Sequence, residues 1–172
     1  VPSASLTGPL ALTCQFLRSV TSPVLAAGDS MDETGVADVL SLGTQAAQLG
    51  TAFIPCPESG AQRAHKDALL AAREDITSIT EKFSGKPARG IANRFMREMN
   101  AHSDAQLAFP AQNSGTGKLH AAADKAGTPD FLEMWAGEGR AMRWSRPASA
   151  VAAVLGAATH QEARRGPGPG TA

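Results

Sequence analysis

The stretch from Ser22 to Gly60 limits the fold more than any other, because it holds two short apolar segments that each run into a glycine. The first, Pro23–Ala27, precedes Gly28 and has the length of one buried strand. The second, Ala46–Phe53, is predicted as another buried strand that Gly50 and Thr51 interrupt. Because a helical pattern lies between them, the sequence predicts two parallel strands around one crossover helix, which is a βαβ unit.

The segment between the two predicted strands carries the signals of a short helix. Ser30 and Glu33 have the spacing of a capping box, in which the serine oxygen accepts a backbone hydrogen bond and the glutamate reaches back to the cap. Gly43 is a typical residue just beyond a helix end. Apolar residues recur between these signals at helical spacing, namely Val36, Val39, Leu40 and Leu42. We therefore predict a helix between Ser30 and Gly43.

Each predicted strand leads into a glycine that has no Cβ to shield the backbone. A ligand phosphate can approach the N–H groups of such a turn closely. The alternative is that these glycines only allow the chain to turn at the end of the sheet. The pattern favours a phosphate site near Gly28 and Gly50.

Several motifs along the chain carry a resemblance to one family. They are AAG (Ala26–Gly28), QLGTAF (Gln48–Phe53), CPESG (Cys56–Gly60), FSGKPARGIANRFMREM (Phe83–Met99), FPAQN (Phe109–Asn113) and DFLEMWAGEG (Asp130–Gly139). Together they resemble the C-terminal portion of nitronate monooxygenase, formerly called 2-nitropropane dioxygenase, over roughly Pro9 to Leu155. The long run beginning at Phe83 is the most specific part, since many phosphate-binding barrels share short AAG or LGT turns.

The resemblance implies an α/β fold, the C-terminal part of an FMN-binding (β/α)₈ TIM barrel. Residues 1–60 would hold the last two βα units, 61–160 a mostly helical region and 161–172 a disordered tail. By the same resemblance the FMN phosphate would be bound by Gly28 in one turn and by Gln48, Leu49, Gly50 and Thr51 in the other. The implied reaction is oxidative denitrification, in which a nitronate and O₂ are converted to a carbonyl compound and nitrite. The redox chemistry belongs to the flavin.

Two features depart from the family pattern. The first turn usually reads AAGGI in the family, whereas Asp29 here places a carboxylate where a phosphate would bind. Two like charges about 4 Å apart repel by roughly 1 kcal/mol in water, so we expect Asp29 to weaken FMN binding.

The family's active-site histidine lies in an upstream Gly-Gly-His turn that these 172 residues do not contain. A whole barrel needs on the order of 250 residues, which predicts a truncated chain without a catalytic residue of its own.

Composition excludes some classes of function and leaves others open. The chain has 16 basic and 16 acidic residues, which gives no electrostatic case for binding nucleic acid or an anionic membrane. Cys14 and Cys56 form no disulfide framework, and no metal-ligand spacing is present. No apolar run approaches the ~20 residues that span a bilayer, and no signal peptide is visible. We expect a cytoplasmic protein.

Beyond the predicted βαβ unit, helical patterns cover Ala64–Arg73, Phe131–Met142 and Ala148–Ala158, while Asn100–Gly117 resembles a loop. His65, His102 and His120 lie between polar neighbours and are predicted on the surface. Cys56 is expected to be a buried small residue, and Gln112 and Trp135 are expected to serve packing.

Three hypotheses remain open at this point. The first is the FMN-dependent nitronate-oxidising enzyme or its cofactor-binding part. The second is a related flavin barrel such as enoyl-acyl-carrier-protein reductase. The third is a non-catalytic remnant that forms a homo-oligomer or needs a missing N-terminal half, because two barrel strands leave unpaired edges.

Overall fold

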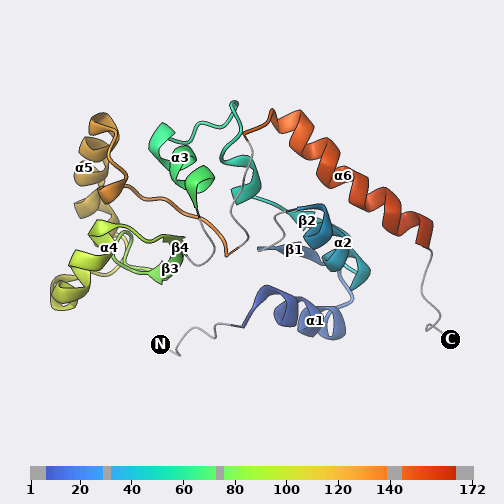
Figure 1. Ribbon diagram of the computed structural model, residues 1–172. Helices are drawn as coiled ribbons and strands as arrows, with labels where there is room; N and C mark the ends of the chain where they lie inside the picture. The colour runs from blue at the N-terminus through green and yellow to red at the C-terminus, as the bar shows by residue number, and fades with distance from the viewer. Residues whose placement is uncertain (1–6, 29–31, 73–75, 139–144, 166–172) are drawn as a thin grey trace. The chain divides into compact units, whose positions relative to one another are not determined.

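The predicted βαβ unit is present in the computed structural model, which describes residues 7–28, 32–72, 76–138 and 145–165. Strands β1 (Leu25–Ala27) and β2 (Ala46–Gln48) are parallel, with Leu25 opposite Ala46 and Ala27 opposite Gln48. Helix α2 (Glu33–Ser41) connects them (Figure 1). The crossover therefore has the predicted order, and the chain has an α/β fold.

Two local predictions about this unit are wrong in detail. The second strand ends at Gln48 rather than at Phe53, because Thr51–Phe53 form a 3₁₀ turn, η1, closed by a hydrogen bond from Phe53 N–H to Gly50 O. The cap of α2 is Asp32 and not Ser30, which lies outside the described residues. The Asp32 carboxylate accepts a 2.9 Å hydrogen bond from Gly35 N–H, as an N-cap side chain does.

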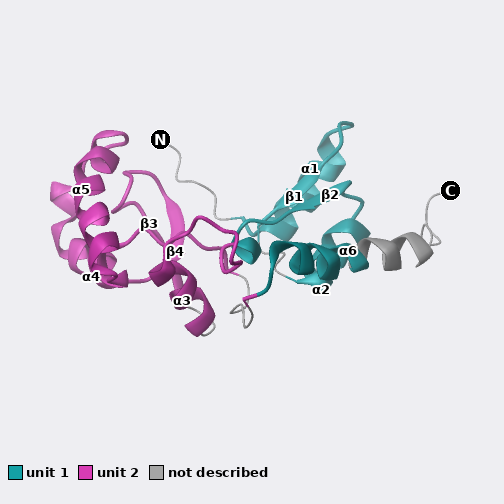
Figure 2. Ribbon diagram, turned by 90° about the horizontal axis from the view of Figure 1, so that it is seen from above, with its two compact units in different colours: residues 1–53, 146–172 teal, residues 54–145 magenta. Residues whose placement is uncertain are grey.

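The chain divides into two compact units, coloured separately in Figure 2. Unit 1 contains residues 1–53 and 146–172, and unit 2 contains residues 54–145. In unit 1, α1 (Pro9–Ser19) packs against β1, and α6 (Ala148–Arg165) packs along α2. Residues 161–165 are thus helical, although a disordered tail was predicted to begin at 161; residues 166–172 lie outside the described part. The C-terminal helix belongs with the N-terminal βαβ unit because Val151 and Leu155 become buried there.

Unit 2 is built on an antiparallel pair, β3 (Thr77–Thr80) and β4 (Ala88–Ile91). The segment after Phe131, predicted as a helix to Met142, is extended along β4 instead. Ile91 N–H donates to Met134 O and Ala136 N–H donates to Arg89 O. Burial alternates along it, with Leu132, Met134 and Ala136 buried, which is the period of a strand. Residues 139–142 lie outside the described residues.

The remaining elements of unit 2 are helical. They are α3 (Arg63–Ala71), α4 (Arg94–Met99), η2 (Asn100–Ala105), α5 (Ala111–Ala126) and η3 (Pro129–Phe131). Helices η2 and α5 cover most of the loop predicted for Asn100–Gly117, so that prediction is wrong. The first part of α5 was missed because its inner face is partly polar there: Gln112 donates to Lys82 O and Thr116 donates to Phe83 O. Its second part agrees with the helix that the sequence predicts over Leu119–Lys125.

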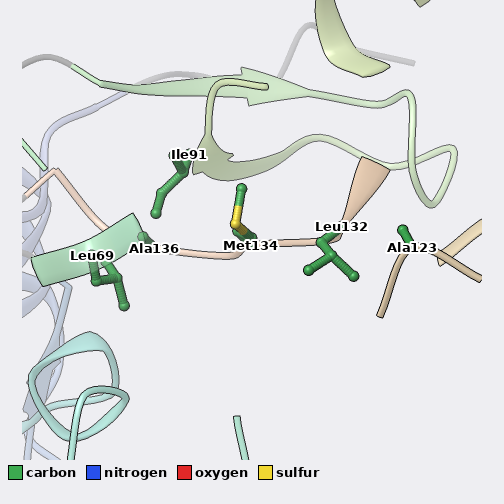
Figure 3. Close-up of a cluster of buried hydrophobic side chains, with 6 residues drawn as sticks. All are labelled: Leu69, Ile91, Ala123, Leu132, Met134 and Ala136. Atoms are coloured by element: carbon green, nitrogen blue, oxygen red, sulfur yellow. The ribbon is translucent and has the colours of Figure 1, made fainter. Parts of the chain in front are cut away.

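Among the described residues of unit 2, two groups of side chains form buried clusters. The first consists of Leu69, Ile91, Ala123, Leu132, Met134 and Ala136 (Figure 3). The second is aromatic and centres on Phe83, whose side chain is 1% exposed. Its ring lies 5.0 Å from Phe95 and 5.4 Å from Trp135 between centroids. Both contacts have the tilted or edge-on geometry that aromatic pairs prefer.

Candidate functional site at the carboxyl edge of the parallel strands

The predicted phosphate-binding residues meet at one edge of the sheet in unit 1. Ala27 and Gln48 are the last residues of β1 and β2 and lie opposite each other in the parallel register. Gly28 and Leu49 follow directly, so both turns leave the sheet at the same edge. Carboxyl ends of parallel strands are where α/β proteins bind ligands. The geometry therefore brings together the residues that sequence reasoning selected.

Gly28 has a reason to be glycine within the protein itself. Its φ is +132°, a conformation that other residues rarely adopt, and an added Cβ would lie 3.1 Å from the Pro9 side chain. The turn after β1 therefore depends on this glycine with or without a ligand. Asp29, predicted to repel a phosphate, lies outside the described residues.

Gly50 differs from Gly28 in its backbone conformation and in the space around its Cα. Its φ is outside the left-handed region, and a Cβ built on it meets no atom within 4 Å. It is exposed, while its neighbours Leu49 and Thr51 are half-buried. Neither backbone strain nor internal packing requires a glycine here. The space around Gly50 is open, and a glycine at such a position leaves backbone N–H groups accessible to a phosphate.

Cys56 and Lys66 in unit 2 have structural roles. Burial raises the pKa of the Cys56 thiol, and the nearby Glu58 carboxylate adds to this effect. A thiol held protonated is a poor nucleophile. The Lys66 ammonium donates to Cys56 O and Ser59 O, both at 2.8 Å, and thereby fixes the turn between them.

Gln112 and Trp135 pack inside unit 2, as predicted. The Gln112 side chain is buried and joins two loops, because its amide donates to Lys82 O at 2.6 Å and its oxygen accepts from Leu107 N–H at 2.9 Å. Trp135 lies half-buried against Phe83. Neither residue lies in unit 1 with the predicted phosphate turns.

Of the histidines predicted on the surface, His65 is buried and His120 is half-buried. His65 is 6% exposed, and burial lowers its pKa while a hydrogen bond to the Trp135 backbone opposes that shift. His120 Nδ1 lies 2.6 Å from Phe131 O, and its ring packs against Phe83 and Phe95. Gln112, Thr116 and His120 recur every four residues and so lie on one face of α5. This spacing could have indicated that the face turns inward, but its residues are polar and apolar periodicity does not detect them. His102 is exposed, as predicted.

Within the described part of the chain, no group of three or more His, Cys, Asp or Glu side chains could hold a metal ion. Among the described helices, none has both the length and the hydropathy needed to cross a bilayer.

Comparison with known proteins places the chain in a family. The nitronate monooxygenase family profile matches residues 2–155. A probable nitronate monooxygenase of Staphylococcus aureus strain Newman is 36% identical over 146 residues, which are 85% of this chain and 41% of that protein. The probable nitronate monooxygenase of Bacillus subtilis strain 168 is 40% identical over 135 residues, which are 78% and 39% of the two chains. The chain thus spans about two-fifths of the length of these relatives.

Solved structures agree with this assignment. A nitroalkane oxidase from Streptomyces ansochromogenes superposes with a TM-score of 0.84 at 40% identity, over 92% of this chain and 45% of that one. FabK from Thermotoga maritima has a TM-score of 0.74 at 24% identity, over 91% and 50% of the two chains, and supports the fold alone. From the family profile, the curated relatives and the shared fold, this chain belongs to the nitronate monooxygenase family, whose members are oxidoreductases.

Proposed function

We propose that this chain provides the cofactor-phosphate end of an FMN-dependent nitronate monooxygenase, formed by the last two βα units of a (β/α)₈ barrel. The observation that carries the proposal is the parallel register of β1 and β2, which brings Gly28 and Gln48–Thr51 to one carboxyl edge. In barrels of this class the phosphate is bound by the loops after the last two strands. Family membership supports the flavin, and the strand edge supports the position of its phosphate.

The residues at this edge fit a phosphate. Gly50 leaves its backbone open, with no atom within 4 Å of a built Cβ. Backbone N–H groups at Gly28, Gly50 and Thr51 would hold the phosphate, and the Gln48 and Leu49 backbone would lead the chain into that turn. When bound, FMN supplies the electron transfer between a nitronate and O₂. The part of this chain is to bind and orient the cofactor.

The substrate belongs to the same proposal. Oxidative denitrification converts an alkyl nitronate and O₂ to a carbonyl compound and nitrite. The histidines in the described part of unit 2 are buried or lie outside any strand-ending turn, so we assign no catalytic residue to this chain. A cytoplasmic location stays a prediction.

Another flavin barrel, such as an enoyl-acyl-carrier-protein reductase, has weaker support, because the nitroalkane oxidase structure is 40% identical and FabK only 24%.

The proposal can be tested in a chimaera in which this chain replaces the matching 135-residue segment of the B. subtilis relative. We expect flavin to copurify near one per chain and nitrite to form from propane-2-nitronate. Gly50→Asp should remove most of the flavin, because it adds a carboxylate at the phosphate turn. Gly50→Ala should retain more flavin, and Gly115→Asp should retain all of it, since position 115 has equal space in unit 2.

Two outcomes would contradict the proposal. One is a folded chimaera, verified by circular dichroism, that binds no flavin. The other is equal flavin content in the Gly50→Asp and Gly115→Asp variants. Flavin titration of the 172-residue chain alone addresses the remnant alternative, because stoichiometric binding would exclude a cofactor-free remnant.

A further inference from the structure

Two histidines from different helices hold one extended segment of unit 2, residues 131–136. His120 of α5 lies with its Nδ1 2.6 Å from Phe131 O, and since a carbonyl can only accept, the ring nitrogen donates. His65 of α3 forms a hydrogen bond to the Trp135 backbone. Because His65 Nε2 has no partner, its Nδ1 makes this bond. The segment 131–136 is thus tied to α5 near its start and to α3 near its end.

The same segment lies beside β4. Ile91 N–H donates to Met134 O at 2.8 Å, and Ala136 N–H donates to Arg89 O at 3.2 Å. Gly90 allows this close approach, because an added Cβ would lie 2.9 Å from Met134 O. The pairing is short, and a single hydrogen bond adds little net stability. The position of the segment therefore depends also on its contacts with the two helices.

The ring of His65 is enclosed by apolar groups. The residue is 6% exposed, and its Nε2 is buried without a hydrogen-bond partner. Its neighbours on α3, Ala64, Ala68 and Leu69, belong to the first cluster of unit 2. A neutral Nε2 leaves only a lone pair unsatisfied there. A protonated Nε2 would be a buried, charged donor with no acceptor, which costs much more.

The charged side chains on α3 and on the elements around it have other partners. They are Arg63 with Asp67, Lys66 with the Cys56 and Ser59 carbonyls, Arg89 with Glu138, Glu133 with His120, and Asp130 near Arg94. Burial lowers the pKa of His65 and the hydrogen bond to Trp135 opposes this, with no contribution from a charged group in the described part of the chain. A protonated His65 would therefore have no carboxylate to balance its charge.

His120 differs from His65 in this respect. Its Nε2 lies 3.7 Å from Glu133 Oε1, so a proton there would be placed beside a carboxylate. Its Nδ1 would still donate to Phe131 O. Acid therefore disfavours the contact at the Trp135 end of the segment and leaves the contact at the Phe131 end intact.

We infer that the segment 131–136 is a pH-sensitive latch: protonation of His65 releases its Trp135 end from α3 and β4, while His120 keeps its Phe131 end in place. The latch is closed above about pH 6.5, the ordinary value for histidine, and opens as the pH falls toward the lower pKa of the buried ring. This conformational device is independent of the proposed cofactor site.

Hydrogen–deuterium exchange of the 172-residue chain tests the latch. Exchange of peptides covering residues 131–136 is compared at about pH 7.5 and about pH 5, after correction for the intrinsic pH dependence of amide exchange. Protonation of a histidine with an ordinary pKa in the open state can favour opening by at most about thirtyfold at that lower pH. We expect an acceleration between about fivefold and this limit. Peptides covering β3 should not accelerate.

Variants identify the residue that senses pH. His65→Asn keeps an N–H donor near the position of Nδ1 but cannot be protonated, so the acceleration should disappear. His65→Gln fills more of the ring's volume and provides a second variant that does not titrate. His102→Asn, at an exposed histidine, is the matched control and should accelerate like the unchanged chain. His120→Gln should raise exchange at both pH values and retain their ratio.

Trp135 gives an independent measurement. The chain has two tryptophans, so Trp144→Phe leaves Trp135 as the only one. Its ring packs edge-on against Phe83, and opening of the latch should make it more accessible to acrylamide at about pH 5 than at about pH 7.5. Adding His65→Asn to this variant should remove the difference.

Four results would overturn the inference. They are equal exchange of the segment at both pH values, an unchanged acceleration in both His65 variants, the same acceleration in β3, and a loss of acceleration in His120→Gln alone. The third would mean that acid unfolds the whole of unit 2, and the fourth would assign the sensor to His120.

Discussion

The two units bury their side chains to different extents. Unit 2 has an interior of large apolar residues, with Phe83 at 1%, Leu132 at 2% and Met134 at 2% exposed. The residues of β1 and η1 that unit 1 buries are small, Ala26 and Ala52. Since burial stabilises by roughly 25 cal/mol per Å² of apolar area, large buried side chains contribute far more per residue. Unit 2 therefore buries large aromatic and aliphatic side chains, whereas the buried residues of β1 and η1 are alanines and the larger buried residues of unit 1, Val36, Val151 and Leu155, lie on helices α2 and α6.

Polar groups differ between the units in the same way. Asn93 is 5% exposed and caps α4 by accepting from Met96 N–H, while its amide donates to Leu132 O and Pro129 O. Asp32 caps α2 through one hydrogen bond in a half-buried position. The same type of cap is thus part of the core in unit 2 and a local feature in unit 1.

Phe83→Ala should cause the largest loss of stability. Truncating a fully buried phenylalanine removes about 3–5 kcal/mol, and Phe83 contacts Phe95, His120 and Trp135. Urea unfolding followed by circular dichroism measures this free energy. Phe109→Ala is the control, because Phe109 is 48% exposed and should change stability by less than about 1 kcal/mol. Equal effects of the two substitutions would contradict a core centred on Phe83.

The two caps allow a direct comparison of the units. Asn93→Ala should cost about 2–4 kcal/mol, because it removes the cap and leaves two carbonyl groups without this partner. Asp32→Ala should cost only about 1 kcal/mol, the usual value for an N-cap. Unfolding curves of both variants measure the difference. A larger loss for Asp32→Ala would reverse the order we assign to the two units.

Gly85→Ala tests a turn of unit 2 that packs closely. Gly85 has φ +81°, and an added Cβ would lie 2.6 Å from Phe109 N and 2.8 Å from Leu107 O. We expect a loss of about 1–3 kcal/mol in thermal unfolding. Gly115→Ala in α5 has open space and should gain about 0.5–1 kcal/mol. Opposite signs would support the described packing, and a neutral Gly85→Ala would contradict it.

Replacing His65 should have the smallest effect on stability, and this effect should appear as a change in how the free energy of unfolding depends on pH. Burial lowers the pKa of His65 below its ordinary value of 6.5, so the unfolded chain binds this proton more readily than the folded chain. The stabilising contribution is therefore complete above about pH 6.5 and is lost as the pH falls toward the lower pKa of the folded state. His65→Gln should flatten stability against pH between 7 and 5. His102→Gln, at an exposed histidine, should leave the slope unchanged.

Much of unit 1 could be predicted from local signals. The strand–helix–strand order follows from apolar runs that end in Gly28 and from the helix stop at Gly43, all within the same forty residues. The second strand was predicted too long, because an apolar run does not show where strand pairing ends and the turn at Thr51 begins. The site residues could be selected from the two turns and the family resemblance. That both turns lie at the same edge of the sheet follows from the predicted parallel pairing of the two strands.

By itself, the sequence determined the βαβ order, the glycine turns and the family, because these depend on residues close together in the chain. The tertiary structure decided the burial of His65, the half-buried position of His120, the polar inner face of α5 and the extended course of Leu132–Ala136. Each depends on a partner far away in sequence, such as Lys82 O, which accepts from Gln112 thirty residues later. A buried polar side chain is stable only where a backbone group meets it, and local periodicity carries no information about that distant group.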